Sequence, residues 1–589
     1  MNANNKNTLD NVEIHLSDEQ QKFIGLALEG KNILVEACIG SGKTTSIQAL
    51  CNTLPSKKKI LYLTYNRLLK VDAKNKITNR NATVTNYHGF VYPYLLRAGY
   101  HCGFSDSITK FTEKRLPIPK FDVLIIDEYQ DIELDFSKML EYIKSTNPAM
   151  QIIMVGDMAQ KIYDKTTLNV HDWALDFIGD HVDYEFTKCF RLQPELASEL
   201  GDIWNKRIEG VNPDCTVRTM KLNEIAKYLA EQNPGDILCL GAKTGVMTNV
   251  LNKLETRYHE KFNKFTVYAT INDRDANIEP NPNTAIFTTF DGSKGMEKPI
   301  CVIFDWDTSY WYTRAGMPDT KQSILKNIFC VAASRGKKEI IFVQGKHSLL
   351  TREDICSPFP QTELEEVYTS NMFDFKYVED IQTLMKMLKT TPIPSNDTSV
   401  IKISNKDGLI DLSPCIGIYE EAVFFTKYDI DADIKLTCDM HGLKNIFTGN
   451  YSLDKKILYL TKLETCQNRY VSQVNMPFVS DDEKKQLIDR LSTEFSPDET
   501  VQVDTDYDLN GVKVKSRCDV LKDNIVWELK FTSELRPEHY LQLAMYLITM
   551  DKPYGILWNV RTNKKVRVSI KGSKKKFLKQ VYKTITKTA

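Results

Sequence analysis

Two adjacent carboxylates, Asp127 and Glu128, stand directly after the apolar run from Val123 to Ile126. A short apolar run of this kind is typical of a strand that is buried on both faces of a parallel sheet. Because open α/β sheets bind ligands beyond the carboxyl ends of their strands, both side chains are predicted to face a ligand. One carboxylate would hold Mg²⁺ while the other polarises a water molecule. The start of an ordinary helix is the alternative interpretation.

A second apolar run, Ile33 to Val35, leads into a glycine-containing loop that ends in Lys43 and Thr44. This is the pattern of a P-loop, in which backbone N–H groups surround phosphates, the lysine reaches the β and γ phosphates, and the threonine binds Mg²⁺. The strand predicted before the loop and the helix predicted after it favour this interpretation. The sequence therefore predicts an ATP site that contains Ala37, Gly40, Ser41, Gly42, Lys43, Thr44 and Thr45.

Both stretches belong to a longer series of motifs that runs from about residue 16 to about residue 340. The pentapeptide Asp127-Glu128-Tyr129-Gln130-Asp131 resembles the Walker B motif of superfamily 1 helicases of the UvrD/Rep type. Other segments resemble further motifs in that family's order, and they contain Gln20, Asn66, His88, Gln160, Arg191, Lys294 and Arg335. The resemblance implies two RecA-like domains that hydrolyse ATP and move along DNA. Thr45 departs from the pattern, since many relatives carry an arginine at its place.

The resemblance also implies a role for each matching residue. Gln20 would read the adenine edge, although it also completes a capping box with Ser17. Asp127 would hold Mg²⁺ together with Thr44. The other residues implied in ATP binding or hydrolysis are Glu128, Gln160, Phe190, Arg191, Gly295, Glu297 and Arg335. The residues implied in DNA binding are Tyr65, for which packing under its own helix is the alternative, Asn66, His88 and Tyr163.

A second group of charged residues lies near the C-terminal end of the sequence. Glu528 and Lys530 alternate along one predicted strand and so point to one face, while Asp519 ends the strand predicted before it. Asp519 and Glu528 offer oxygen ligands to a divalent cation, and Lys530 would orient the attacking water. The group resembles the core of PD-(D/E)XK nucleases, and a plain amphipathic edge strand is the alternative.

Two predicted helices extend this resemblance. Gln542 and Tyr546 match the Q-x-x-x-Y helix of the RecB-like branch, and they are expected on the DNA side. Glu421 matches a helix that adds a further metal ligand in that branch, with Glu420 as the fallback. Mg²⁺ or Mn²⁺ is expected, because all these ligands are hard oxygen donors. No iron–sulfur cluster is expected, because the last cysteine, Cys518, precedes Glu528.

Composition bounds these interpretations. The 589 residues are enough for about three or four domains. The formal net charge is zero, but the segment from Arg561 to Ala589 contains eleven Lys or Arg and no Asp or Glu. This segment is predicted to be a solvated basic tail or a contact for phosphates. The polar start lacks the apolar core of a secretory signal, and the thirteen cysteines form no C-x-x-C pair, so an intracellular, cytoplasmic protein is expected.

The predicted fold class is α/β. Two RecA-like parallel-sheet domains are expected at 1–190, with a small insertion near 91–120, and at 191–345; a linker at 346–400 and a restriction-endonuclease-like domain with a basic tail at 401–589 complete the chain. The predicted function is an ATP-dependent DNA helicase or translocase, 3′ to 5′ by resemblance, coupled to a metal-dependent nuclease that acts on single-stranded DNA or ends. The alternatives are a DNA-stimulated ATPase that remodels protein–DNA complexes and an ATPase that gates the nuclease.

Overall fold

The computed structural model describes residues 15–65, 73–100, 106–243, 245–269, 280–318, 320–404, 407–447 and 449–588. Contacts divide the chain into two compact units. The first unit comprises residues 1–159 and 168–190, and the second comprises residues 160–167 and 191–589. Residues 160–167 thus belong to the second unit, although the chain on both sides of them belongs to the first. We call residues 160–167 the bridging segment.

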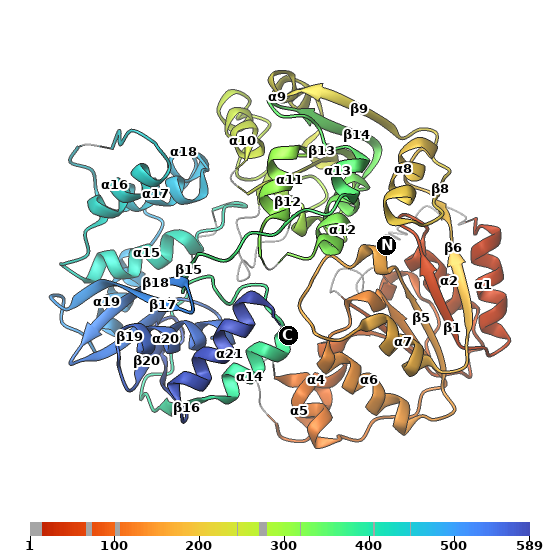
Figure 1. Cartoon of the computed structure of the whole chain (residues 1–589), viewed down its shortest axis with the longest axis horizontal. Coiled ribbons are helices and arrows are strands. Elements are labelled where there is room, and N and C mark those ends of the chain that lie inside the picture. The colour runs from red at the N-terminus through yellow and green to blue at the C-terminus, as the bar shows by residue number, and fades with distance from the viewer. Residues whose placement is uncertain are drawn as a thin grey trace, which may run out of the picture. The chain divides into compact units, whose positions relative to one another are not determined.

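The first unit is built on six parallel strands in the order β3-β2-β4-β5-β1-β6. Figure 1 labels three of them, β1, β5 and β6. The strands are β1 Ile33–Ala37, β2 Ile60–Thr64, β3 Ala82–Asn86, β4 Val123–Asp127, β5 Gln151–Gly156 and β6 Val182–Phe186. Residues of β4 enter two hydrophobic clusters alternately, Val123 and Ile125 into one, Leu124 and Ile126 into the other. The continuous apolar run arises because the strand is buried on both faces, as predicted.

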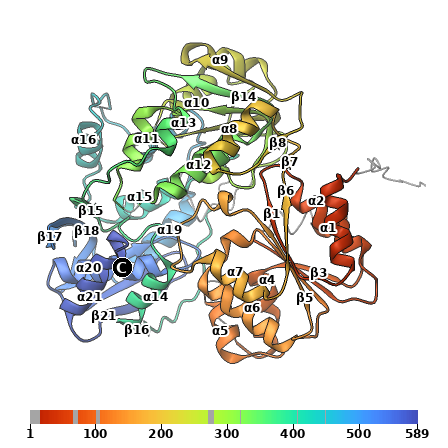
Figure 2. The same cartoon turned by 45° about the vertical axis from the view of Figure 1, so that its right-hand side comes forward.

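Helices cover both faces of this sheet (Figure 2). One face packs against α1 Asp18–Leu28 and α2 Lys43–Thr53. The other face packs against α4 Tyr87–Arg97, α5 Ser107–Lys114, α6 Leu134–Thr146 and α7 Val170–Ile178. The small insertion expected near 91–120 corresponds to the later part of α4 and to α5.

The second unit begins with another sheet of six parallel strands, in the order β11-β12-β10-β13-β14-β9. Its strands are β9 Thr216–Lys221, β10 Ile237–Gly241, β11 Val267–Ala269, β12 Ala285–Thr289, β13 Lys298–Ile303 and β14 Gly336–Gln344. Its helices are α8 Pro194–Trp204, α9 Leu222–Glu231, α10 Val246–Arg257, α11 Thr308–Ala315 and α12 Gln322–Ala333. Two parallel sheets of this kind confirm that part of the predicted α/β class.

The second unit also contains a mixed sheet of seven strands in the order β15-β18-β19-β20-β21-β16, with β17 paired to β18. Its strands are β15 Glu366–Tyr368, β16 Leu388–Ile393, β17 Thr500–Leu509, β18 Val512–Lys522, β19 Ile525–Lys530, β20 Gly555–Asn559 and β21 Lys564–Ile570. One hydrophobic cluster joins this sheet to α14 Val378–Lys386, α20 Pro537–Thr549 and α21 Lys574–Thr586. A second cluster joins it to the helices α15 Ser413–Phe424, α16 Ile430–Met440, α17 Leu453–Thr465 and α19 Asp481–Leu491.

The linker expected at 346–400 is wrong for much of its length. This stretch contains α13 Arg352–Cys356, β15, α14 and β16. Strand β15 pairs with β18 and strand β16 pairs with β21, so both belong to the mixed sheet. Thr390 to Ile393, whose composition is typical of linkers, lie in the edge strand β16, and Pro392 is tolerated there because an edge strand leaves N–H groups unused.

The predicted basic tail is also not a tail. Lys574 to Thr586 form α21, and Phe577, Val581 and Ile585 on one face of this helix are buried in the core of the mixed sheet. The lysines of α21 occupy the opposite, exposed face. Its positive charge therefore stays available to solvent while its apolar side holds the fold together.

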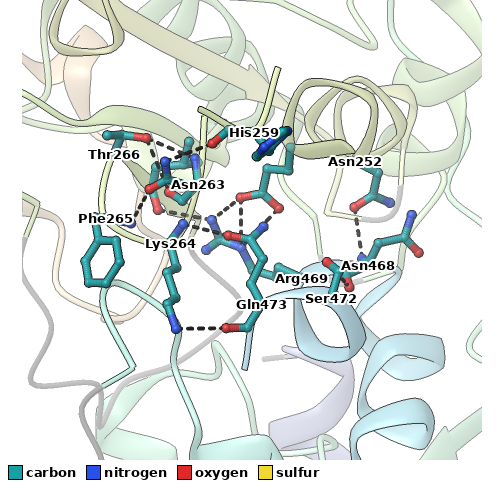
Figure 3. A network of polar contacts seen from close by, with 12 residues as sticks. Asn252, His259, Asn263, Lys264, Phe265, Thr266, Asn468, Arg469, Ser472 and Gln473 are labelled. Atoms are coloured by element: carbon teal, nitrogen blue, oxygen red, sulfur yellow. Dashed lines mark hydrogen bonds and ion pairs between the residues drawn. The ribbon is translucent and has the colours of Figure 1, made fainter. Parts of the chain in front are cut away.

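We call the mixed sheet from β15 to β21, together with the helices packed on it, the nuclease-like region. A polar network joins the second parallel sheet to the helical part of this region (Figure 3). Arg469, in the short helix α18 Arg469–Ser472, donates hydrogen bonds through Nε and Nη2 to Glu255 of α10 and through Nη2 to the carbonyl oxygen of Val267, at 3.1 Å for the last. Lys264 donates to the carbonyl oxygen of Gln473 at 2.9 Å. The side chains of Arg469 and Glu255 expose only 1% and 3% of their surface, so this is a buried ion pair.

None of the helices within the described ranges combines the length and the apolar character that crossing a bilayer requires.

Candidate ATP-binding and nuclease sites

The P-loop lies between β1 and α2, where the sequence predicted it. Gly42 is the N-cap of α2 and has a φ of 76°, in the left-handed region that favours glycine. A Cβ atom at Gly42 would stand 2.7 Å from Nε2 of Gln20, so a larger residue is excluded by contact as well. Lys43 and Thr44 open α2, whose first N–H groups point out of the helix end. Such a helix start is an anion-binding site.

The side-chain amide of Gln20 connects the start of α1 to the P-loop. Its Oε1 accepts a hydrogen bond from the backbone N–H of Ser17 at 3.0 Å, which completes the predicted capping box. Its Nε2 donates to the carbonyl oxygen of Ser41 at 3.0 Å, and Gln20 is buried. Both ends of the amide are therefore engaged within the protein. The structure supports the capping interpretation, and the adenine contact stays a prediction.

Asp127 and Glu128 stand at the carboxyl end of β4, as predicted. Asp127 is fully buried and accepts a hydrogen bond from the Tyr62 hydroxyl at 2.9 Å, while its Oδ1 has no hydrogen-bond partner among the described residues. Burial, followed by the charge of Glu128, raises the pKa of Asp127 to about 7, and Lys43 acts in the opposite direction. An acidic group with a spare buried oxygen beside a P-loop lysine fits a Mg²⁺ ligand.

Glu128 is held in a strained backbone conformation in front of the P-loop. Its φ of 56° and ψ of 48° are left-handed, which costs energy for a residue with a side chain. Its Oε2 lies 3.6 Å from Nζ of Lys43 and accepts a hydrogen bond from Nε2 of Gln130 at 2.5 Å. The carboxylate is therefore fixed next to the lysine that would bind the terminal phosphates. This is the position that a water-polarising base requires.

Gln130 contacts the predicted base, although the sequence assigned it no role. It is fully buried, and besides its bond to Glu128 its Oε1 accepts the backbone N–H of Asp157 at 3.0 Å. Gly156 makes room for it, because a Cβ there would lie 2.5 Å from the same Oε1. One amide thus joins the base to the start of the next motif. Its place inside the Walker B pentapeptide was the available signal.

Phe190 completes the predicted nucleotide residues of the first unit. Its backbone N–H donates to the carbonyl oxygen of Gly40 at 3.0 Å, and 45% of its surface is exposed. An exposed aromatic ring that is tied to the P-loop suits the predicted contact with a nucleobase.

The second unit brings together residues from three of the predicted motifs. Arg191 donates to the carbonyl oxygen of Ser334 at 3.2 Å and forms an ion pair with Glu297, and Lys337 binds the same carboxylate at 2.5 Å. Burial raises the pKa of Glu297, but Arg191 and Lys337 outweigh it and keep that pKa below its usual range. Arg335 lies next to this group and is buried, with Nε donating to the carbonyl oxygen of Val331 at 2.8 Å. Both predicted arginine fingers therefore lie in one cluster.

The bridging segment carries two predicted residues. Gln160 ends the stretch 152–160, which resembles helicase motif III, and Lys294 lies in the stretch 285–297, which resembles motif V. The carbonyl oxygen of Gln160 accepts a hydrogen bond from Nζ of Lys294 at 3.1 Å, which joins the two motifs. The ring of Tyr163 has Nζ of Lys165 4.6 Å and Nζ of Lys294 5.6 Å from its centre. Gly295, next to Lys294, has a φ of 76° and permits the turn there. A half-buried aromatic flanked by two cations suits the predicted DNA contact, which stays a prediction.

The other predicted DNA residues of the first unit are less conclusive. Tyr65 is half-buried at the exit of β2, and Asn66 lies outside the described residues. Nδ1 of His88 lies 3.1 Å from the Ser107 hydroxyl, and its ring packs edge-on against Phe136. These neighbours give His88 a structural role within its own unit, so the DNA contact rests on the resemblance alone.

The nuclease-like residues meet where β18 and β19 pair. Val520 pairs with Trp527, so Asp519 lies beside Glu528, and Asp519 accepts the backbone N–H of Leu529 at 2.7 Å. Asp519 lies inside β18 and does not end that strand as expected. Oε1 of Glu528 is 2.6 Å from Nζ of Lys530, so these two side chains share one face of β19.

Helix α15 adds two further carboxylates to this group. Glu421 accepts a hydrogen bond from Gln502. Glu420 is 2% exposed, and within the part of the chain that the structure describes its Oε2 has no hydrogen-bond partner. Burial and the charge of Asp519 raise the pKa of Glu420 and of Glu421 well above the usual range. Burial and Asp519 do the same for Glu528, whereas Lys530 acts against the rise. Asp519, Glu528, Glu420 and Glu421 thus form one buried cluster of carboxylates whose charges act on one another's pKa.

This donor set fits a hard divalent cation. Oε2 of Glu528 and Oε2 of Glu420 are buried without hydrogen-bond partners in the described ranges, and all donors are carboxylate oxygens. Within the described ranges, no three His, Cys, Asp or Glu side chains are already spaced as metal ligands. The fit therefore rests on the type of donor atom and on the buried oxygens, since the side chains are not spaced as a ligand set.

Gln542 and Tyr546 lie behind the carboxylates. Nε2 of Gln542 donates to the Tyr546 hydroxyl at 2.7 Å, and these side chains are 8% and 2% exposed. Burial, and then the charges of Glu528 and Asp519, raise the pKa of Tyr546. Such burial does not suit the expected direct DNA contact, which stays a prediction.

Comparisons with known proteins agree with these two sites. Residues 20–166 match the family described as AAA domain, and residues 485–571 match the PD-(D/E)XK nuclease superfamily. No curated protein matches the chain.

Solved structures resemble the chain only distantly. They include a variant of S. cerevisiae Dbp5 bound to Gle1 and IP6, with 11% identity and a TM-score of 0.35, covering 56% of this chain and 82% of that one. A hypothetical ATP-dependent RNA helicase from Sulfolobus tokodaii has 16% identity and a TM-score of 0.22, covering 56% and 93%. A Pif1 helicase from a study of unwinding at forked DNA has 14% identity and a TM-score of 0.31, covering 58% and 94%. The family matches therefore show that residues 20–166 are similar to AAA domains and that residues 485–571 are similar to the PD-(D/E)XK nuclease superfamily.

Proposed function

We propose that this protein is an ATP-driven DNA translocase and helicase that feeds DNA to its own divalent-metal-dependent nuclease. The observation that carries the proposal is that one chain brings together the residues of both candidate sites. Lys43, Asp127 and Glu128 would supply a phosphate cation, a metal ligand and a base. Asp519, Glu528 and Lys530 would supply two metal ligands and a cation for cleavage.

In the motor, ATP would bind to the P-loop with its adenine near Phe190. Glu128 would polarise the attacking water, and its orientation is set by Gln130. Arg191 and Arg335 would stabilise the charge on the transferred phosphoryl group, because arginines that reach the γ-phosphate raise the rate of hydrolysis by about a thousandfold or more. Repeated hydrolysis would move the protein along one strand, 3′ to 5′ by its resemblance to UvrD-like motors.

In the nuclease, Asp519, Glu528 and one glutamate of α15 would hold Mg²⁺ or Mn²⁺. When bound, the cation would polarise a phosphate oxygen and activate water. Lys530 would orient that water and steady the developing charge. Glu421 matches the family spacing, while Glu420 has the buried oxygen that lacks a hydrogen-bond partner among the described residues. Helix α15 therefore offers two candidates for this one ligand.

The proposal is tested with forked DNA, labelled at one strand, in the presence and absence of ATP and of Mg²⁺. Strand separation with ATP and cleavage with metal are both expected. ATP hydrolysis without strand separation would favour an ATPase that remodels complexes or gates the nuclease. Absence of cleavage with any divalent metal or any DNA end would mean that the nuclease fold serves binding only.

A further inference from the structure

In the sequence, the bridging segment lies between two parts of the first unit. It begins at Gln160, the last residue of the stretch 152–160 that resembles helicase motif III, and runs beyond that motif. Peptide bonds connect it to Ala159 and Leu168 of that unit, but its contacts are with the second unit. The second parallel sheet holds it at three points. Gln160 accepts from Lys294, the carbonyl oxygen of Lys161 accepts from Nδ2 of Asn327 at 2.9 Å, and the Tyr163 hydroxyl donates to the carbonyl oxygen of Asp291 at 3.4 Å.

The same segment is held by the nuclease-like region. The backbone N–H of Val378 donates to the carbonyl oxygen of Lys165 at 2.8 Å. Glu379, one residue further along α14, accepts from the Thr166 hydroxyl and from the N–H of Thr167, the latter at 3.2 Å. The first turn of α14 is therefore bonded to the end of the bridging segment through backbone and side-chain hydrogen bonds.

Asp164 lies at the centre of this junction. Its carboxylate accepts from Nζ of Lys321 at 3.0 Å, from Nζ of Lys587 at 3.2 Å and from the Tyr377 hydroxyl at 3.4 Å. The ammonium of Lys587 also binds the backbone oxygen of Asp164 at 3.1 Å. Lys321 precedes α12 of the second sheet, Tyr377 precedes α14, and Lys587 follows α21. One carboxylate thus joins three parts of the protein.

Burial makes the pair of Asp164 and Lys587 more than a surface ion pair. Their side chains expose 10% and 8% of their surface. Exposed pairs contribute little, because water and salt screen them. Removing Lys587 would leave the buried Asp164 carboxylate with only one ammonium partner among the described residues, Lys321, whose side chain is 55% exposed. The position of the bridging segment and the position of the end of α21 are therefore energetically linked.

A packed route leads from this junction to the nuclease carboxylates. Ile381 and Leu384 of α14 share a hydrophobic cluster with Leu541 and Leu543 of α20. Helix α20 carries Gln542 and Tyr546, and the pKa of Tyr546 responds to the charge of Glu528. Because packed cores do not deform continuously, a displacement of α14 would be passed to α20 as a body. The buried pair of Arg469 and Glu255 fixes the opposite side of this region to the second sheet.

We infer that Asp164 is a positioning residue that couples ATP turnover to DNA cleavage through its ion pair with Lys587. When the ATP state moves motif III, the bridging segment pulls on α14 and on the end of α21, and α20 changes the placement of Glu528. The inference rests on the proposed function, since it requires a motor and a nuclease that work together. It assigns to Asp164 and Lys587 no contact with ATP, DNA or metal.

The test uses the full-length variants Lys587→Ala, Asp164→Asn and both together, with Lys386→Ala as the control. Lys386 is an exposed lysine on α14 itself and lies far along the helix from Tyr377. Three quantities are measured: DNA-stimulated phosphate release, metal-dependent cleavage of a short single strand without ATP, and nucleotides released from duplex DNA per ATP hydrolysed. Lys587→Ala is expected to keep the first two and to lower the third about fivefold or more, the range of an allosteric coupling.

The double variant separates coupling from a general loss of stability. If the ion pair carries the effect, the double variant falls no further than either single variant, because residues that act as a pair are not additive. A wild-type ratio in Lys587→Ala, an equal fall in Lys386→Ala, additive falls, or a joint loss of all three activities would each overturn the inference. Absence of ATP-dependent cleavage in the wild-type protein would instead refute the proposed function itself.

Discussion

Replacing Gln130 by leucine separates the orientation of the base from its presence. The substitution keeps approximate side-chain size and removes two hydrogen bonds, one to the Glu128 carboxylate and one from the Asp157 N–H. A bond between neutral groups contributes about 1 kcal/mol and one to a charged group about 1.5–3 kcal/mol, so the first unit should lose roughly 2–4 kcal/mol of stability. Glu128 would keep its charge but lose the donor that fixes it. ATP hydrolysis should fall at least about tenfold, since a positioned general base contributes roughly 100- to 10,000-fold.

The assay combines thermal melting with DNA-stimulated phosphate release, and the matched control is Gln151→Leu. Gln151 is also buried in the first sheet, at the start of β5, where its amide donates to the carbonyl oxygens of Ala27 and Lys31 at 2.8 and 2.7 Å. Both variants should melt at lower temperature, and only Gln130→Leu should lose hydrolysis at a temperature where both are folded. Normal hydrolysis in Gln130→Leu, or the same loss in Gln151→Leu, would refute the assigned role of the amide.

Three further predictions follow from the two sites and from α21. Glu128→Gln should bind ATP but release phosphate at least about 100-fold more slowly, and turnover near the wild-type rate would show that another group activates the water. Asp519→Ala should lose both Mn²⁺ binding, measured by calorimetry, and cleavage, whereas Lys530→Ala should lose cleavage only; persistent cleavage in Asp519→Ala would place the active site elsewhere. The double variant Lys575→Glu with Lys579→Glu should bind DNA more weakly and flatten the slope of log affinity against log salt by about 0.7–0.9 for each DNA phosphate that the variant no longer neutralises; an unchanged slope would make the exposed face of α21 a solvated surface.

Local sequence patterns were sufficient to predict the positions of the main candidate residues of both sites. The P-loop, the carboxylates after β4 and the alternation of Glu528 with Lys530 depend on residues that are close in sequence, so their spacing alone predicts them. Gln20 shows where this stops. Capping was visible from Ser17, but the bond from Gln20 to the Ser41 carbonyl joins residues far apart in the chain.

The errors have identifiable causes. The linker prediction relied on composition, and an edge strand such as β16 tolerates the same Pro and Thr residues that linkers contain. The tail prediction relied on charge and overlooked Phe577, Val581 and Ile585, whose spacing of four residues is the apolar stripe of a helix. The junction at Asp164 could not be predicted, because Lys587 lies 423 residues away and neither residue has a distinctive neighbour.

The buried pair of Arg469 and Glu255 decides how this protein can be divided in the laboratory. An excised nuclease fragment would retain Arg469 and lose Glu255, so a guanidinium that is 1% exposed would meet solvent together with the apolar surface around it. Such a fragment is expected to aggregate. A lack of cleavage by the fragment would therefore not test the role of the predicted catalytic carboxylates. The second parallel sheet and the nuclease-like region should therefore be expressed, purified and crystallised as one piece.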